Sequence, residues 1–260
     1  MNFNIQLILS IARNTFREAV RDRVLYNLVL FVLLITASAI FLGELTAGQE
    51  ARTIVNLGLS AMLVFGAFIS IFVGVSLVSK EIERRTIYAI FSKPIGRGAF
   101  IVGKYLGLCL TLAVNVLIMG IGVSLAILYV VGGNLAWTIW GAIFLIYLEL
   151  MILTAVAILF SSFSSPALSA LLTFFIFIIG HFSQSLRDFA ANLGSSFTRL
   201  FFDVLYYALP NFSFYSFVTN AAHGEAPPSA MIGGALLYAA AYVGILLAAT
   251  VLIFNRRNFK

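Results

Sequence analysis

The stretch IVNLGLSAMLVFGAFISIFVGVSLVS occupies residues 54–79 and contains no acidic, basic or histidine residue. As an α-helix it exceeds the roughly 20 apolar residues that cross a hydrocarbon core of about 30 Å. A helix that is apolar on every side is either buried or lies in a membrane. Residues 54–79 therefore predict a membrane-spanning helix.

The composition of the whole chain favours the same interpretation. Hydrophobic residues make up 62 % of the 260 residues and charged residues 10 %, against roughly 45–50 % and about 25 % in soluble domains. The formal charge of +6 could suggest nucleic acid. The basic residues, however, gather at the ends of apolar stretches, where they orient membrane helices. We therefore expect no nucleic-acid partner.

Five more apolar stretches accompany the first, at residues 24–43, 100–131, 139–160, 167–182 and 231–254. The stretch at 167–182 is short and crosses a bilayer only if its helix continues past His181 or if the bilayer is thinned. Lys104 lies near the start of the third span, and its side chain can reach the interface. The pattern predicts an all-α polytopic membrane protein of six transmembrane helices, forming one domain over residues 1–260.

Lysine and arginine predict the orientation of these six spans. Thirteen of them fall on one face: Arg13, Arg17, Arg21, Arg23, Lys80, Arg84, Arg85, Lys93, Arg97, Lys104, Arg256, Arg257 and Lys260. The opposite face carries Arg52, Arg187 and Arg199. Because the face rich in lysine and arginine is cytoplasmic, both termini are expected in the cytoplasm. A bacterial cytoplasmic (inner) membrane fits this arrangement.

Residues 1–23 are expected to form an interfacial helix. Their apolar residues recur mostly at three- and four-residue steps: Ile5, Ile8, Leu9, Ala12, Phe16, Ala19 and Val20. This is the pattern of an amphipathic helix that lies in the headgroup region with its apolar face down. The alternative, a helix packed on a soluble domain, is weaker because the sequence offers no such domain.

Residues 184–229 are expected outside the membrane, between the fifth and sixth spans. Within them, residues 197–209 are apolar enough to resemble a seventh span, but Asp203 lies in the middle and Pro210 follows. We interpret the segment as one or two short amphipathic helices that dip into the outer leaflet. A Gly-Glu-Ala-Pro-Pro turn at 224–228 follows them.

The connection at 80–99 is the largest expected on the cytoplasmic face. It reads KEIERRTIYAIFSKPIGRGA, with dense charge first and an apolar stripe at helical spacing until Pro94 and Gly96 end the helix. Such a short helix can dock in a groove of a cytoplasmic partner. An ordinary positively charged loop that only fixes topology explains the spacing equally well. The candidate contact residues are Glu81, Glu83, Arg84, Arg85, Thr86, Ile87, Ile90 and Phe91.

The stretch SKEIERRTIYAIFSKPIGRGAFIVGKYLG, residues 79–107, resembles the signature region of type-2 ABC exporter permeases, especially the branch associated with multicopper-enzyme maturation. The residues that match this pattern in order are Glu81, Glu83, Thr86, Pro94, Arg97, Gly103, Lys104 and Tyr105. Many members have glycine just before the threonine, where this chain has Arg85. The resemblance extends to the interfacial first helix, the six spans and the long outer segment.

The resemblance implies that residues 81–93 form a coupling helix beneath a separate ABC ATPase. The chain contains no Gly-x-x-x-x-Gly-Lys-Ser/Thr phosphate loop, so ATP and Mg²⁺ are expected in the ATPase subunit and no cofactor in this chain. Two permease chains, identical or related, would pair within the membrane lipid. Closure of the ATPases would then tilt the spans around a central pathway.

Glu149 is the one carboxylate deep within an apolar stretch. An intramembrane acid is a functional candidate, but the favoured interpretation is a structural one, in which the carboxyl is protonated or hydrogen-bonded to a polar group such as Asn115. Ion-gradient transport with Glu149 as proton carrier, or a membrane scaffold that transports nothing, are the alternatives to an ABC permease. Inverted repeats, which ion-driven transporters often carry, are not evident.

The remaining polar and small residues suggest structural roles. His181 is an improbable metal ligand, because the chain holds one further histidine, His223, and one cysteine, Cys109. No arrangement of catalytic residues emerges, so we expect no enzymatic activity in this chain. Four glycines are expected to allow close helix packing, and two tryptophans to anchor the interface: Gly103, Gly107, Gly233, Gly234, Trp137 and Trp140.

Overall fold

The computed structural model describes residues 2–20, 30–31, 34–35, 37–38, 41, 49–83, 96–130, 133–192 and 196–256. Within these ranges every regular element is a helix, which confirms the all-α prediction. The elements are α1 (Asn2–Ala19), α3 (Glu50–Glu83), α5 (Arg97–Val130), α6 (Gly133–Ser161), α7 (Pro166–Asn192), α8 (Ser196–Ala208), the 3₁₀ helix η2 (Phe212–Tyr215), α9 (Val218–Ala222) and α10 (Ser229–Arg256).

Five of these helices are long and apolar enough to cross a bilayer: α3, α5, α6, α7 and α10. They coincide with five of the six predicted spans. The helix that contains the short stretch at 167–182 does continue past His181, since α7 ends at Asn192. The sixth predicted span, residues 24–43, lies mostly outside the described residues, so the count of six stays a prediction. Its described residues Phe31 and Ile35 are buried, and the Phe31 ring meets Phe65 of α3 edge-on at 5.7 Å.

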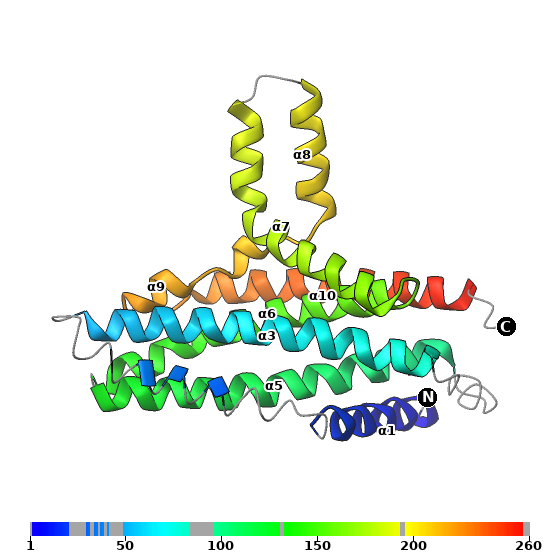
Figure 1. The fold of residues 1–260 in the computed structure, drawn as a ribbon, viewed down its shortest axis with the longest axis horizontal. Helices are drawn as coiled ribbons and strands as arrows, with labels where there is room; N and C mark the ends of the chain where they lie inside the picture. Colours follow the sequence, from blue (N-terminus) through cyan, green and yellow to red (C-terminus); the bar gives the residue numbers. More distant parts are fainter. Residues whose placement is uncertain are drawn as a thin grey trace.

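The long helices lie side by side with α6 in the middle (Figure 1). Helix α6 packs against α3, α5, α7 and α10, and 72 % of its most apolar window is buried, against 17 % for α10. Helix α6 is apolar on all sides, as residues 139–160 show, and such a helix is stable only when surrounded. Helix α10 therefore leaves most of its apolar surface for lipid or for another chain.

Small residues set the close approach of α3 to α6. A Cβ atom built on Gly66 would lie 2.5 Å from Leu150, and one on Gly74 would lie 3.0 Å from the Cβ of Ala157. Glycine at such positions allows two membrane helices to pack backbone to backbone. This contact fixes the register between α3 and the central helix.

The C-terminal part of α7 and α8 form a hairpin that projects away from the bundle (Figure 1). Asp203 accepts a 3.1 Å hydrogen bond from Arg187, and the guanidinium of Arg187 stacks over Tyr206 at 4.6 Å. The 13 residues of α8 extend only about 20 Å at 1.5 Å per residue, which is too short to cross a bilayer. The prediction that residues 197–209 form a short helix and not a seventh span therefore agrees with the structure.

The predicted turn at 224–228 is present between α9 and α10. Gly224 has φ +83°, a backbone conformation that glycine adopts without steric cost. Pro227 then packs so closely on α6 that a Cβ atom on Gly141 would lie 2.4 Å from its ring. The turn thus holds the start of α10 against the central helix.

Candidate functional sites

The first candidate site is the start of α5, immediately after the 80–99 connection. A Cβ atom on Gly103 would lie 2.8 Å from Ile11, and one on Gly107 would lie 2.6 Å from both the carbonyl oxygen of Ala12 and the Cβ of Thr15. The two glycines therefore form a notch that receives α1. The prediction that Gly103 and Gly107 allow close packing is confirmed, and α1 is their partner.

Only part of the predicted stripe of α1 faces this notch. Ala12 and Ala19 are buried, together with Thr15, whereas Ile5 and Leu9 remain exposed. Lys104 also turns toward α1. Its side chain is 4 % exposed, and Nζ lies 3.7 Å from a carboxylate oxygen of Glu18. The charge of Lys104 therefore lies beside an anion of α1, and whether its side chain reaches the membrane interface stays a prediction.

Arg97 joins the start of α5 to the end of α10. Its Nη1 donates to the carbonyl oxygens of Phe254 at 2.8 Å and Asn255 at 3.0 Å. The last carbonyls of a helix have no partner within the helix, and a cation there also opposes the negative end of the helix dipole. Beside this contact the rings of Phe100 and Phe254 stack at 6.3 Å. One arginine therefore fastens two helices that lie far apart in the sequence.

The predicted contact residues of the connection are only partly described. Glu81 and Glu83 belong to the last turn of α3. Arg84, Arg85, Thr86, Ile87, Ile90 and Phe91 lie outside the described residues, and the description resumes at Gly96. The connection thus begins at the end of α3 and ends at the helix that carries the Arg97 and Lys104 contacts.

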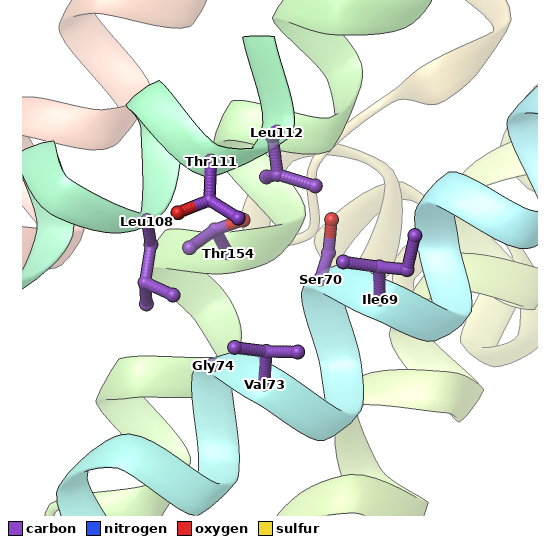
Figure 2. Close-up of a pocket in the computed structure, with 8 residues that line it drawn as sticks. All are labelled: Ile69, Ser70, Val73, Gly74, Leu108, Thr111, Leu112 and Thr154. Carbon is purple, nitrogen blue, oxygen red and sulfur yellow. The ribbon is translucent and has the colours of Figure 1, made fainter. Parts of the chain in front are cut away.

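The three central helices α3, α5 and α6 meet at a narrow hydroxyl junction, which Figure 2 shows with Ser70, Thr111 and Thr154 facing one another. Each hydroxyl donates to the carbonyl four residues earlier in its own helix, at 2.9, 2.9 and 2.8 Å respectively. Such back-bonding satisfies a buried hydroxyl and bends its helix slightly. All three hydroxyl hydrogens are thus used within their own helices, and we interpret the junction as a packing contact.

The second candidate site lies between α6 and α7, where the structure buries Glu149. The partner of Glu149 is His181 of α7, whose Nε2 lies 3.4 Å from Oε1. The suggested tie to Asn115 is not what the structure shows, since the amide nitrogen of Asn115 donates to the carbonyl of Thr111 at 2.7 Å. No sequence pattern indicates the Glu149–His181 contact, because the two residues lie on different helices.

Residues 210–215 form the wall of this second site. Asn211 is buried, and its Oδ1 accepts hydrogen bonds from Ser183 Oγ at 2.9 Å and from the Ser213 N–H at 3.0 Å. A Cβ atom on Gly180 would lie 2.5 Å from the Phe212 ring. Tyr215 donates to the carbonyl of Ala235 at 2.9 Å, and its burial raises the pKa of this phenol. The segment therefore ties α7 to α10 beside the Glu149–His181 contact.

Replacing Asn211 with alanine is expected to lower the free energy of unfolding by about 2 kcal/mol, because it strips the acceptor from the buried Ser183 hydroxyl and from the part-buried N–H and hydroxyl of Ser213. Thermal unfolding of the detergent-purified protein measures the change. Asn220→Ala is the matched control. Its exposed amide donates to Glu225, so a loss of only about 0.5 kcal/mol is expected. Equal losses in the two variants would contradict the bridging role of Asn211.

The two predicted tryptophan anchors differ in their surroundings, and the two adjacent glycines of α10 have no close neighbour among the described residues. Trp137 is 78 % exposed, as an interface anchor should be. The ring of Trp140 instead packs against α5, 3.4 Å from a Cβ atom built on Gly120. A Cβ atom on Gly233 or Gly234 would meet nothing within 4 Å among the described residues. These two glycines therefore pack no helix described in this chain.

The chain is similar to known membrane transporter proteins. The sequence profile of a family described as "ABC-2 family transporter protein" matches residues 9–258. One curated relative is the probable ABC transporter permease protein NosY of Pseudomonas aeruginosa, which is 29 % identical over 129 residues. The match covers 48 % of this chain and 47 % of that protein, so the chain spans about half the length of the curated relative that it matches.

Proposed function

The chain belongs to the ABC-2 family of transporter proteins, and from that premise we propose that it is a permease subunit driven by a separate cytoplasmic ABC ATPase. In this proposal the 80–99 connection receives the movement of the ATPase, and the spans convert it into passage of a substrate, in the export direction. ATP and Mg²⁺ bind the ATPase and not this chain. Family membership favours this mechanism over transport driven by an ion gradient.

The junction at the start of α5 carries the coupling proposal. The helix that follows the connection is fixed to α10 through Arg97 and to α1 through the glycine notch and Lys104. A push on the connection would therefore move the ends of three helices together rather than one loop alone. Packed helices transmit such a displacement because they shift as rigid elements.

The proposed topology follows from the charges. The connection, α1 and both termini would face the cytoplasm of a bacterial inner membrane, because lysine and arginine gather there. Residues 184–229 would then lie on the outer side. The exposed apolar side chains of α8, among them Phe197, Leu200 and Val204, would be covered by the outer leaflet.

A second permease chain, identical or related, completes the proposed assembly. The lightly buried helix α10 and its open glycines at 233 and 234 support a further partner in the membrane, since small residues allow helices of two chains to approach. Membrane lipid covers the remaining apolar surface.

Co-purification with the proposed ABC ATPase tests the proposal. The double variant Glu81→Ala/Glu83→Ala is expected to reduce the bound ATPase about tenfold, which corresponds to about 1.4 kcal/mol of binding free energy, and to reduce ATP-dependent transport with it. Glu50→Ala changes a glutamate in the first turn of the same helix α3 and serves as the control. If ATPase binding and transport survive the double variant unchanged, the coupling role of the connection is wrong.

A further inference from the structure

The Glu149–His181 contact has a geometry that restricts where its protons can be. Glu149 is 1 % exposed, and its Oε1 has no aligned hydrogen-bond donor within the described residues, although His181 Nε2 is 3.4 Å away. On the other side of the imidazole ring, Nδ1 lies 3.1 Å from the carbonyl oxygen of Phe177. The rings of Phe177 and Phe212 pack on the imidazole with centroids 4.7 and 5.7 Å away.

The Phe177 carbonyl determines the tautomer of His181. A carbonyl oxygen can only accept, so Nδ1 must carry a hydrogen for the 3.1 Å contact to be favourable. In a neutral imidazole the other nitrogen, Nε2, then presents a lone pair to Glu149 Oε1. An ionised carboxylate facing that lone pair would place two acceptors against each other beside the buried Glu149, where such a contact is costly.

We propose that Glu149 and His181 form a proton-binding site that holds one proton between Oε1 and Nε2. The proton resides on the carboxyl, which then donates to a neutral imidazole, or on the imidazole, which then donates to a carboxylate. The pair carries no net charge in either case, which is the state that a membrane interior tolerates. This inference rests on geometry alone and does not depend on the transport role.

The other titratable group beside the site cannot replace this proton. Tyr215 of η2 interacts electrostatically with Glu149, but its hydroxyl hydrogen is directed to the carbonyl of Ala235 on α10. Asn115 of α5, the partner considered from the sequence, uses its amide hydrogen within its own helix. The shared proton therefore makes the polar Glu149–His181 part of the α6–α7 contact attractive.

The site lies where a lost proton would have the largest structural effect. His181 follows Gly180, on which the Phe212 ring rests, and it lies in the second half of α7, which ends at Asn192. Removal of the proton would turn the contact repulsive and separate α7 from α6 at this point. The proton thus holds the base of the α7–α8 hairpin on the bundle.

Two spectroscopic measurements on one sample test the proposal. In a His223→Gln background His181 is the only histidine of the chain, so its ¹⁵N signals report which ring nitrogens are protonated. The infrared carboxyl band that disappears in Glu149→Gln reports whether Glu149 is protonated. We expect Nδ1 to be protonated and exactly one further proton on the pair. A neutral ring beside an ionised carboxylate, or an imidazolium beside a protonated carboxyl, would overturn the proposal.

Stability of two variants gives an independent test. Glu149→Gln keeps a donor, because its amide N–H can point to Nε2, and is expected to melt at the temperature of the native protein. Glu149→Leu offers no donor and is expected to melt at a clearly lower temperature, with α7 more accessible to proteases. Glu225→Leu, at an exposed glutamate, controls for the loss of a carboxylate. A Glu149→Gln protein as unstable as Glu149→Leu would contradict the shared proton.

Discussion

Replacing Gly107 with leucine is expected to separate α1 from α5 and to lower the free energy of unfolding by about 3 kcal/mol. The first added carbon would already lie 2.6 Å from the backbone oxygen of Ala12, and a backbone atom cannot rotate away as a side chain can. Overpacking of this kind costs about 1–3 kcal/mol. The shift of α1 would also withdraw Glu18 from the buried Lys104, which places the expected loss at the upper end.

The same substitution elsewhere in the chain supplies the control. Gly244 belongs to the apolar helix α10 and has no described neighbour within 4 Å of a built Cβ atom. Gly244→Leu is therefore expected to leave the melting temperature of the detergent-purified chain unchanged. The comparison is made by thermal unfolding of both variants at equal expression. Identical melting curves for the two leucine variants would refute the notch between α1 and α5.

Replacing Arg97 with alanine is expected to abolish most ATP-dependent transport while the ATPase still binds. The variant removes two hydrogen bonds from a charged donor to the last carbonyls of α10, and such bonds contribute about 1.5–3 kcal/mol each. The population in which α5 and α10 are joined should therefore fall by roughly tenfold or more. Movement of the connection would then reach α5 without reaching α10.

Two control variants separate this tie from a general effect of charge. Arg97→Lys keeps the positive charge, but its side chain is one atom shorter than the reach of Nη1, the single nitrogen that bonds both carbonyls, so partial transport is expected. Arg52→Ala removes an exposed arginine in the first turns of α3, at the opposite end of the bundle, and should have no effect. Transport activity is measured in vesicles together with the amount of bound ATPase. Full activity of Arg97→Ala would show that α5 acts without α10.

The helices and the spans were predictable, because a residue's preference for lipid is a property of the residue and its neighbours in sequence. The five apolar stretches that the structure describes lie in five long helices. Asp203 and Pro210 predict that the region of α8 is not a span, and α8 has only 13 residues. The glycine pair at 103 and 107 also marked a packing surface, since the absence of a side chain is visible in any sequence.

The partners across helices could not be predicted. Arg97 bonds to backbone carbonyls, which every residue has and which therefore leave no pattern. His181 lies 32 positions after Glu149 in the sequence, although Nε2 and Oε1 are 3.4 Å apart in space. No spacing pattern connects two residues that far apart on different helices. The apolar stripe of α1 predicts a helix at the membrane surface. The sequence does not indicate that α5, which is synthesised later, covers part of this stripe.

That timing has a consequence for the biosynthesis of the protein. The surface that covers Thr15 includes Gly107, which leaves the ribosome about ninety residues later, or roughly 5 to 18 s at ordinary translation rates. During this interval only the membrane surface is available to shelter the apolar stripe of α1. The nascent helix would wait in the headgroup layer and then exchange lipid for α5, with Ile5 and Leu9 still free to remain in contact with lipid afterwards.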